Sequence, residues 1–241
     1  MSSYHLSPGE ILYLLNAAGV SRPSTMTAEE FALPQDTQPA EPQADTDDLL
    51  ALVDYLAVPE VVVRVWRQDG QSAPRSVWYY CGGESAASIE QTPSGAFELS
   101  ELSGAELLLN TVEASIALRP LPADLDFYAV LQREDFLAVR ELADVWSEVP
   151  ALEILEADGL DKLSAKELFD VAAEPEWRAQ VNFSGLREEG NIERVLRVAQ
   201  GPMSAWMAKP LDENVTRVRV ETVQAGEVAQ LLRAYWDDVS C

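Results

Sequence analysis

The stretch Leu52-Val-Asp-Tyr-Leu-Ala-Val-Pro-Glu60 recurs later in the chain as Leu168-Phe-Asp-Val-Ala-Ala-Glu-Pro-Glu176. The shift is constant, because 168 − 52 and 176 − 60 both equal 116. In each copy an apolar helical pattern ends at the Pro-Glu pair, and an extended segment follows at once, Val61 to Arg67 in the first copy and Trp177 to Phe183 in the second. We therefore predict that the same helix-to-strand junction is built twice.

The shift of 116 is close to half of the 241 residues, which predicts two similar halves that share one core. The first half-repeat spans 1–122 and contains a flexible linker at 21–48, rich in Pro, Asp, Thr and Gln, and the second half-repeat spans 123–241. Each half reads as helix, linker, helix, several strands, helix. The predicted fold class is an internally duplicated, pseudo-twofold α+β unit with a central antiparallel β-sheet flanked by helices.

Local signals place the individual elements. Ser7, followed by Pro8 and Glu10, predicts a helix that begins with a capping box. Asp47 or Asp48 is expected to cap a helix that runs to Ala57. A third helix is expected to be capped by Ser103 or Ser100 and to run to Val112, and further helices are predicted at Glu134 to Trp146 and Gly226 to Asp238. The other predicted strands are Val77 to Cys81, Ala87 to Gln91, Ala96 to Leu99, Arg194 to Ala199, Ser204 to Ala208 and Thr216 to Val220.

The charge balance is strongly acidic, with 41 Asp and Glu residues against 17 Lys and Arg residues and a formal net charge of −24. Nucleic acid and anionic membrane surfaces are not expected as partners, because binding to them needs clustered cations. No apolar run approaches the length of a membrane span and the N-terminus has no signal-peptide pattern, so we expect a cytoplasmic protein. The acidity either keeps the chain soluble or offers an acidic face to a protein partner.

Residue types that carry catalysis or bind metals are sparse. The single histidine, His5, precedes the first helix, and the two cysteines, Cys81 and Cys241, have no second ligand at metal-binding spacing. Gly82-Gly83 lacks the lysine and the helix of a phosphate-binding loop. Cys81 lies in an apolar strand pattern, where a free cysteine is most often a small buried residue. We predict no catalytic residue, no cofactor and no metal site, and therefore no enzymatic activity.

Diffuse apolar patterns over most of the chain carry a resemblance to a known family. A helix of Leu and Ala in Leu49 to Val65 ends in Val-Pro-Glu-Val and enters a strand, and in Ser88 to Leu109 the run Glu98-Leu-Ser-Glu-Leu-Ser leads into a Leu-rich helix. The closing runs are Ser204 to Ala208, Val215 to Val220 and Gly226 to Trp236. Together they resemble the EspG family, the cytosolic chaperones associated with type VII (ESX) secretion in actinobacteria. The resemblance implies a pseudo-twofold fold with a central antiparallel sheet and two helical subdomains. It also implies binding of a PE/PPE-type secretion substrate, whose aggregation-prone tip is shielded until export.

The function predicted from these observations is that of a non-enzymatic secretion chaperone or adaptor, which binds a cognate protein client in the cytosol. The client is PE/PPE-like or another type VII substrate. The hairpin turns Gln68–Arg75 and Ser184–Asn191 occupy equivalent positions in the two halves, and Arg67, Arg75 and Arg187 are the predicted protein-binding residues. Two alternatives stay open: a dimeric structural or immunity-type interaction protein, and an enzyme with a carboxylate site between the halves. Self-association as a homodimer stays open as well.

Overall fold

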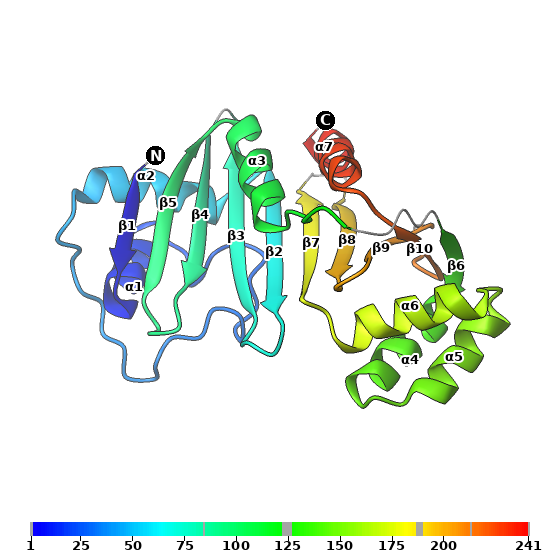
Figure 1. The fold of residues 1–241 in the computed structure, drawn as a ribbon. Helices are drawn as coiled ribbons and strands as arrows, with labels where there is room; N and C mark the ends of the chain where they lie inside the picture. Colours follow the sequence, from blue (N-terminus) through cyan, green and yellow to red (C-terminus); the bar gives the residue numbers. More distant parts are fainter. Residues whose placement is uncertain (1, 84, 122–126, 187–189, 213, 241) are drawn as a thin grey trace.

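A computed structural model describes residues 2–83, 85–121, 127–186, 190–212 and 214–240. Within these residues, one antiparallel sheet of ten strands runs through the whole molecule, and seven helices pack on its two faces (Figure 1). The strand order is β1-β5-β4-β3-β2-β7-β8-β9-β10-β6. The predicted α+β class with a central antiparallel sheet is therefore confirmed.

The bounds of the elements are as follows. The strands are β1 Ser3–Leu6, β2 Val61–Asp69, β3 Arg75–Gly82, β4 Ser85–Gln91, β5 Phe97–Ser103, β6 Tyr128–Gln132, β7 Trp177–Gly185, β8 Ile192–Gln200, β9 Ala205–Pro210 and β10 Arg217–Thr222. The helices are α1 Pro8–Ala17, α2 Thr46–Ala57, α3 Ala105–Ser115, α4 Arg133–Asp144, α5 Glu148–Ala157, α6 Lys162–Ala173 and α7 Ala225–Ser240.

The strand order has the same pattern when it is read from either end. β2 and β7 pair at the centre, and outward from them come β3 and β8, β4 and β9, β5 and β10, and finally β1 and β6. In the central pair Val65 lies opposite Val181, and these two residues are 116 positions apart, which is the shift of the sequence repeat. An approximate twofold axis therefore passes between Val65 and Val181.

Two backbone hydrogen bonds follow the same symmetry at the two ends of the central pair. The Gly70 N–H donates to the Glu176 carbonyl over 2.8 Å, and the Leu186 N–H donates to the Glu60 carbonyl over 2.8 Å. Glu60 and Glu176 are the residues that close the two copies of the repeated stretch. Each copy thus fastens its own half to the first hairpin of the other half.

Alternation along the central strands divides the core into three clusters. Val61, Val63 and Val65 face helices α3 and α7, which pack against each other on one face of the sheet. Val62 points to the opposite face, where α1 and α2 cover the first half. On that same face α4, α5 and α6 cover the second half through contacts such as those of Trp206. The layout is that of a central sheet with one helical subdomain in each half.

The helix starts follow local chemistry, with two corrections. The capping box of α1 is present, since the Ser7 N–H donates to Glu10 Oε2 over 2.7 Å and the Ser7 hydroxyl accepts from the Glu10 N–H. Helix α2 begins slightly earlier than predicted, because Asp45 is its cap. The prediction that Ser103 or Ser100 caps α3 is wrong. Strand β5 continues to Ser103, and Gly104 precedes the helix with φ 84°, a conformation that favours glycine.

The residues 21–45, here called the covering segment, contain neither helix nor strand, as predicted for the linker region. The predicted linker extended to residue 48, but residues 46–48 begin helix α2. The segment is nevertheless packed on the first half. Met26 and Phe31 are buried, and the Phe31 ring lies 5.3 Å from that of Phe97 on β5. Thr27 and Glu30 exchange two hydrogen bonds that close a turn between them. The segment therefore serves as a fixed part of the cover on this half of the sheet.

The two short outer strands, β1 and β6, were not predicted. Strand β1 places His5 opposite Glu98 of β5, so the histidine belongs to the sheet. Cys81 is buried as predicted. Desolvation, followed by the charge of Glu60, raises the pKa of its thiol to about 12.

Candidate protein-binding groove

The two hairpin turns that were predicted as contact regions follow strands β2 and β7, which end at opposite ends of the central strand pair. Strands β2 and β7 are antiparallel, with Val61 opposite Gly185 and Asp69 opposite Trp177. The last residue of β2 and the last residue of β7 are therefore roughly 27 Å apart, given a rise of about 3.4 Å per residue. A partner that touches both turns has to span the sheet. Of the predicted contact residues, Arg187 lies outside the described residues.

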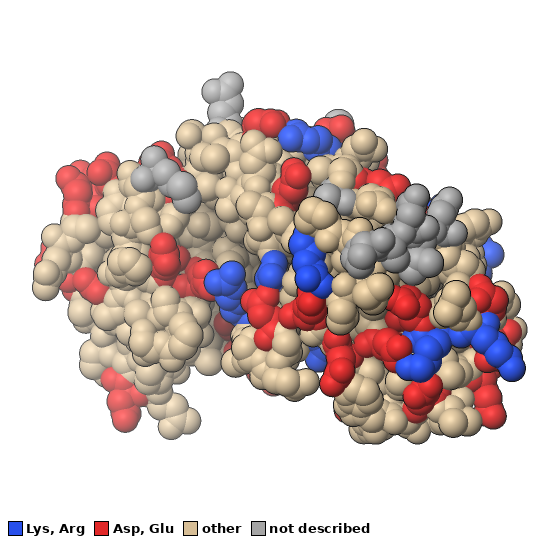
Figure 2. Space-filling model, in the orientation of Figure 1, with Lys and Arg blue, Asp and Glu red and all other residues tan. Residues whose placement is uncertain are grey.

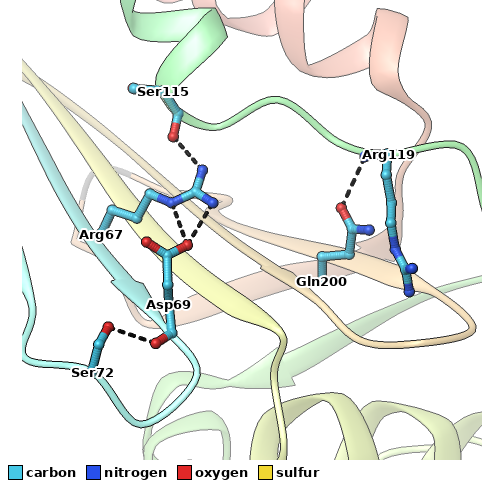
Figure 3. Close-up of polar contacts among 6 residues, drawn as sticks. All are labelled: Arg67, Asp69, Ser72, Ser115, Arg119 and Gln200. Atoms are coloured by element: carbon cyan, nitrogen blue, oxygen red, sulfur yellow. Dashed lines mark hydrogen bonds and ion pairs between the residues drawn. The ribbon is translucent and has the colours of Figure 1, made fainter.

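Arg67 is held by the protein itself. Its guanidinium donates to the Asp69 carboxylate at 2.6 and 2.8 Å and to the carbonyl of Ser115 at the end of α3 (Figure 3). The same group lies over the Trp177 ring, 4.7 Å from its centroid. Arg67 thus joins β2, α3 and β7. Arg75 is its cross-strand neighbour on the same face and is exposed.

A second tie fastens the connection between the halves. The Arg119 N–H donates to Oε1 of Gln200, which is completely buried, at 3.1 Å (Figure 3). The Arg119 side chain donates to the Glu176 carboxylate at 2.8 Å and to the carbonyl of Pro202 at 3.0 Å. The connection that follows α3 is therefore fastened to the second half, at the start of β7 and at the end of β8.

On the opposite face, a strip over the central strands, here called the groove, is partly uncovered between the two helical subdomains. Strand β7 alternates strictly there, with Arg178, Gln180 and Asn182 partly exposed on this side and buried apolar residues on the other. Trp66 of β2 and Arg197 of β8 are the neighbours of Gln180 in the sheet. A row of polar and aromatic side chains thus crosses the middle of the molecule.

Where the groove meets α4 and α6 it deepens into a cavity of about 100 Å³, here called the arginine pocket. Its lining includes Trp66, Arg140, Leu168, Arg178, Gln180 and Arg197. Three arginines from α4, β7 and β8 therefore converge on one small space. This placement is unusual for a chain with a net charge of −24.

The electrostatics of the pocket follow from burial and from mutual repulsion. Desolvation, and then the guanidinium of Arg178, lower the pKa of Arg140 below the usual arginine value, and the charge of Asp144 offsets part of this shift. Desolvation, and then Arg140 and Arg133, lower the pKa of Arg197. Within the part of the chain that the structure describes, neither Arg140 nor Arg197 has an ion-pair partner, and Nε of Arg197 is buried without a hydrogen bond.

An exposed apolar patch borders the groove at the turn between α4 and α5. Val145, Trp146 and Val149 are 71%, 57% and 68% exposed. Asp144, the last residue of α4, pairs with Arg178 at 3.3 Å, which brings this turn to the edge of the groove. Trp146 also has φ 56°, a conformation that a bulky residue rarely adopts. Adjacent large apolar side chains held in solvent are typical of surfaces that bind a partner.

Charged side chains are scattered over the face of the molecule that Figure 2 shows. Figure 2 shows Asp and Glu side chains spread over the visible face, with Lys and Arg gathered in small groups. Among the described residues, no group of three His, Cys, Asp or Glu side chains could hold a metal ion. Over the same residues, none of the helices combines the length and the apolar character that a membrane crossing requires.

Sequence reasoning missed the groove arginines. Arg140, Arg178 and Arg197 lie in three separate elements, and only the fold brings them together. One signal was available in the strict alternation of polar and apolar residues from Arg178 to Ser184, which indicates that the middle of the sheet has one uncovered face.

The architecture of this chain is thus a continuous antiparallel sheet with one helical subdomain in each half. No protein-family model and no curated protein matches the sequence. The structure is similar to that of EspG5, a type VII secretion system chaperone of Mycobacterium tuberculosis solved in complex with a PE25–PPE41 dimer. The TM-score is 0.71, the alignment covers 99% of this chain and 97% of EspG5, and the two sequences are 12% identical. The fold implied by the sequence resemblance is therefore confirmed.

Proposed function

We propose that this chain is a cytosolic chaperone of type VII secretion that binds a protein client of the PE/PPE type. The observation that carries the proposal is the likeness to EspG5 over 99% of the chain, which includes both helical subdomains and the whole sheet. The chaperone function proposed here shields an aggregation-prone part of the client until export, as the sequence resemblance implied.

The central groove is the proposed binding site for the client. Its partly exposed Trp66 and Arg178, and the exposed Trp146 at its border, are of the residue types that dominate binding energy in protein interfaces. Arg75, and Arg187 in the turn after β7, stay proposed as outer contacts. For Arg67 we propose a supporting role, because its charge is already engaged by Asp69.

The division into half-repeats 1–122 and 123–241 is likewise a proposal, in which an internal duplication produced one EspG-like unit. The symmetric strand order and the 116-residue shift between Val65 and Val181 support it. The alternative of an enzyme with a carboxylate site between the halves has no such support. The described lining of the arginine pocket contains no Asp or Glu.

The experiment that tests the function is affinity purification of the tagged protein from its own organism, with mass spectrometry of the eluate. We expect one secreted, helical protein at a stoichiometric ratio. The variant Trp146→Asp is expected to lose most of this partner, whereas Val58→Asp is expected to keep it, because Val58 is 82% exposed but follows α2 in the first half. An eluate with no stoichiometric protein would contradict the proposal.

A further inference from the structure

We infer that the arginine pocket is a carboxylate-binding site that receives one Asp or Glu side chain of the client. The inference rests on the proposed function and adds a chemical requirement for the partner. It is carried by the convergence of Arg140, Arg178 and Arg197 on one cavity, where Asp144 of the rim pairs with Arg178 and no described carboxylate pairs with Arg140 or Arg197.

Arg178 is fixed in place and defines one wall. Its Nε donates to Oε1 of Gln68 at 2.9 Å, and its guanidinium lies 5.9 Å from the centroid of the Trp66 ring. Asp144 lies at the rim of the pocket, and its carboxylate is 3.3 Å from the Arg178 guanidinium. Because Asp144 is largely exposed, this ion pair contributes little to stability. The guanidinium is thus oriented in advance, which lowers the entropy that binding has to overcome.

Arg140 and Arg197 supply the positive charge that favours binding of an anion. Both are partly buried, and within the described residues no carboxylate forms an ion pair with either of them. Burying a cation without a partner is costly, and the chain has 41 acidic residues from which a partner could have been placed. One carboxylate, that of Asp144, acts on Arg140 and Arg178, and only positive charges act on Arg197, so the free protein carries excess positive charge in this pocket.

The chemistry of the pocket selects a carboxylate on a side chain. Arginine binds carboxylates through two parallel N–H bonds, and its planar fork fits that group closely. A cavity of about 100 Å³ has room for a carboxyl group and a short methylene stem, and Leu168 and Trp66 provide apolar walls for the stem. The cavity opens into the groove proposed for the client, so the client is the source of the carboxylate.

The first test measures client binding and stability on the same variants by calorimetry. Arg140→Met and Arg197→Met are each expected to weaken client binding about tenfold, because a charge-assisted hydrogen bond is lost. Their melting temperatures are expected to equal or exceed that of the unchanged protein, since one repulsive charge is removed. Arg194→Met is the matched control, because Arg194 lies on the same strand but faces α7 and pairs with Asp238.

The same test has a counterpart on the client. Replacing each Asp and Glu of the captured client by its amide in turn should identify one position whose loss weakens binding to the unchanged protein about tenfold. That replacement should add nothing further to Arg197→Met, because the two changes remove the same interaction. Full affinity of both pocket variants for the client would overturn the inference while leaving the proposed chaperone function intact.

A second test does not need the client. Acetate is titrated against chloride at constant ionic strength, and the Nε–H signals of the arginines are followed by NMR. Acetate is expected to shift the Arg140 and Arg197 signals in the unchanged protein, and Arg197→Met should abolish the shift at Arg140. Inorganic phosphate is the comparison probe. A response to phosphate without a response to acetate would make the pocket a phosphate site and overturn the inference, as would no response to either anion.

Discussion

The two halves differ in how the arginines on the same face of the sheet are paired. In the first half, Arg64 stacks over Trp78 at 4.8 Å and pairs with Glu30, which the covering segment brings to it at 2.5 Å. In the second half, Arg197 lies on the same face, but no described carboxylate pairs with it. One scaffold is therefore used once as a closed core and once as an open pocket. Function depends on what is added to the scaffold rather than on the scaffold itself.

The largest effect is expected from removing the cover of the first half. Phe31→Ala deletes a buried ring that packs on Phe97 and should lower the free energy of unfolding by about 3 kcal/mol. Urea denaturation measures this, with Leu163→Ala as a control, since that side chain is 72% exposed and should change the value by less than about 0.5 kcal/mol. If Phe31→Ala had no effect, the covering segment would not be part of the folded core.

The second prediction compares the two arginines of the β2–β3 hairpin. Arg67→Ala loses its bonds to Asp69 and Ser115 and its contact with Trp177, so unfolding should become easier by about 1–2 kcal/mol. Arg75→Ala should change stability by less than about 0.5 kcal/mol, because Arg75 is exposed. Thermal and urea unfolding of both variants check this. Equal losses would remove the distinction between a supporting and a freely exposed arginine.

A third change gives the second half an arginine–carboxylate pair like the Arg64–Glu30 pair of the first half. Under the 116-residue shift, Arg64 corresponds to Gln180, which lies beside Arg197 in the sheet. Gln180→Glu places a carboxylate in the arginine pocket and removes the bond that the Gln180 amide donates to Asn182 Oδ1 over 2.8 Å. The new charge pair should outweigh this loss and stabilise the free protein by about 1 kcal/mol, or roughly 3 °C in melting temperature. Client binding should weaken, because the introduced carboxylate occupies the place that we propose for the carboxylate of the client.

The control for that change is Gln35→Glu, which adds the same charge at an exposed position of the covering segment. It should leave the melting temperature within about 1 °C and leave client binding unchanged. A destabilised Gln180→Glu variant would contradict the view that the pocket holds excess positive charge.

The smallest effect is expected from breaking the ion pair between Arg64 and Glu30 in the first half. Glu30→Gln keeps the size of the side chain but leaves Arg64 without its counter-charge, so stability should fall by about 0.5–1 kcal/mol. The two side chains are 28% and 23% exposed, which limits the loss. Unfolding in low and in high salt tests the cause, since the difference between Glu30→Gln and the unchanged protein should shrink as salt rises. A difference that does not depend on salt would point to packing instead.

The sequence predicts the central part of this fold well, because the relevant signals are local. The repeated Pro-Glu junction and the β-branched run after Pro59 predict β2, and the corresponding run after Pro175 predicts β7. Strands β1 and β6 escaped prediction because four or five residues at a sheet edge carry too little apolar pattern. Their pairing depends on β5 and β10, which are far away in sequence.

The candidate site was predicted less well than the fold. Arg67 and Arg75 were chosen because they flank a turn, yet cross-strand pairing directs both to the face that α3 covers. The arginines of the pocket belong to α4, β7 and β8, and their meeting depends on how α4 and α6 pack on the sheet. Spacing in sequence has no information on such packing, whereas alternation within β7 does indicate which residues share a face.

The two outermost strands have a consequence for how this protein behaves in a crowded cell. A ten-stranded sheet with long, flat edges would recruit further copies strand by strand and grow into a filament. Here the sheet ends in β1, with four residues, and in β6, with five, so each edge offers few backbone groups for pairing. Short edges and a net charge of −24 together oppose polymerisation. A wide sheet can therefore serve as a binding platform without becoming a template for its own assembly.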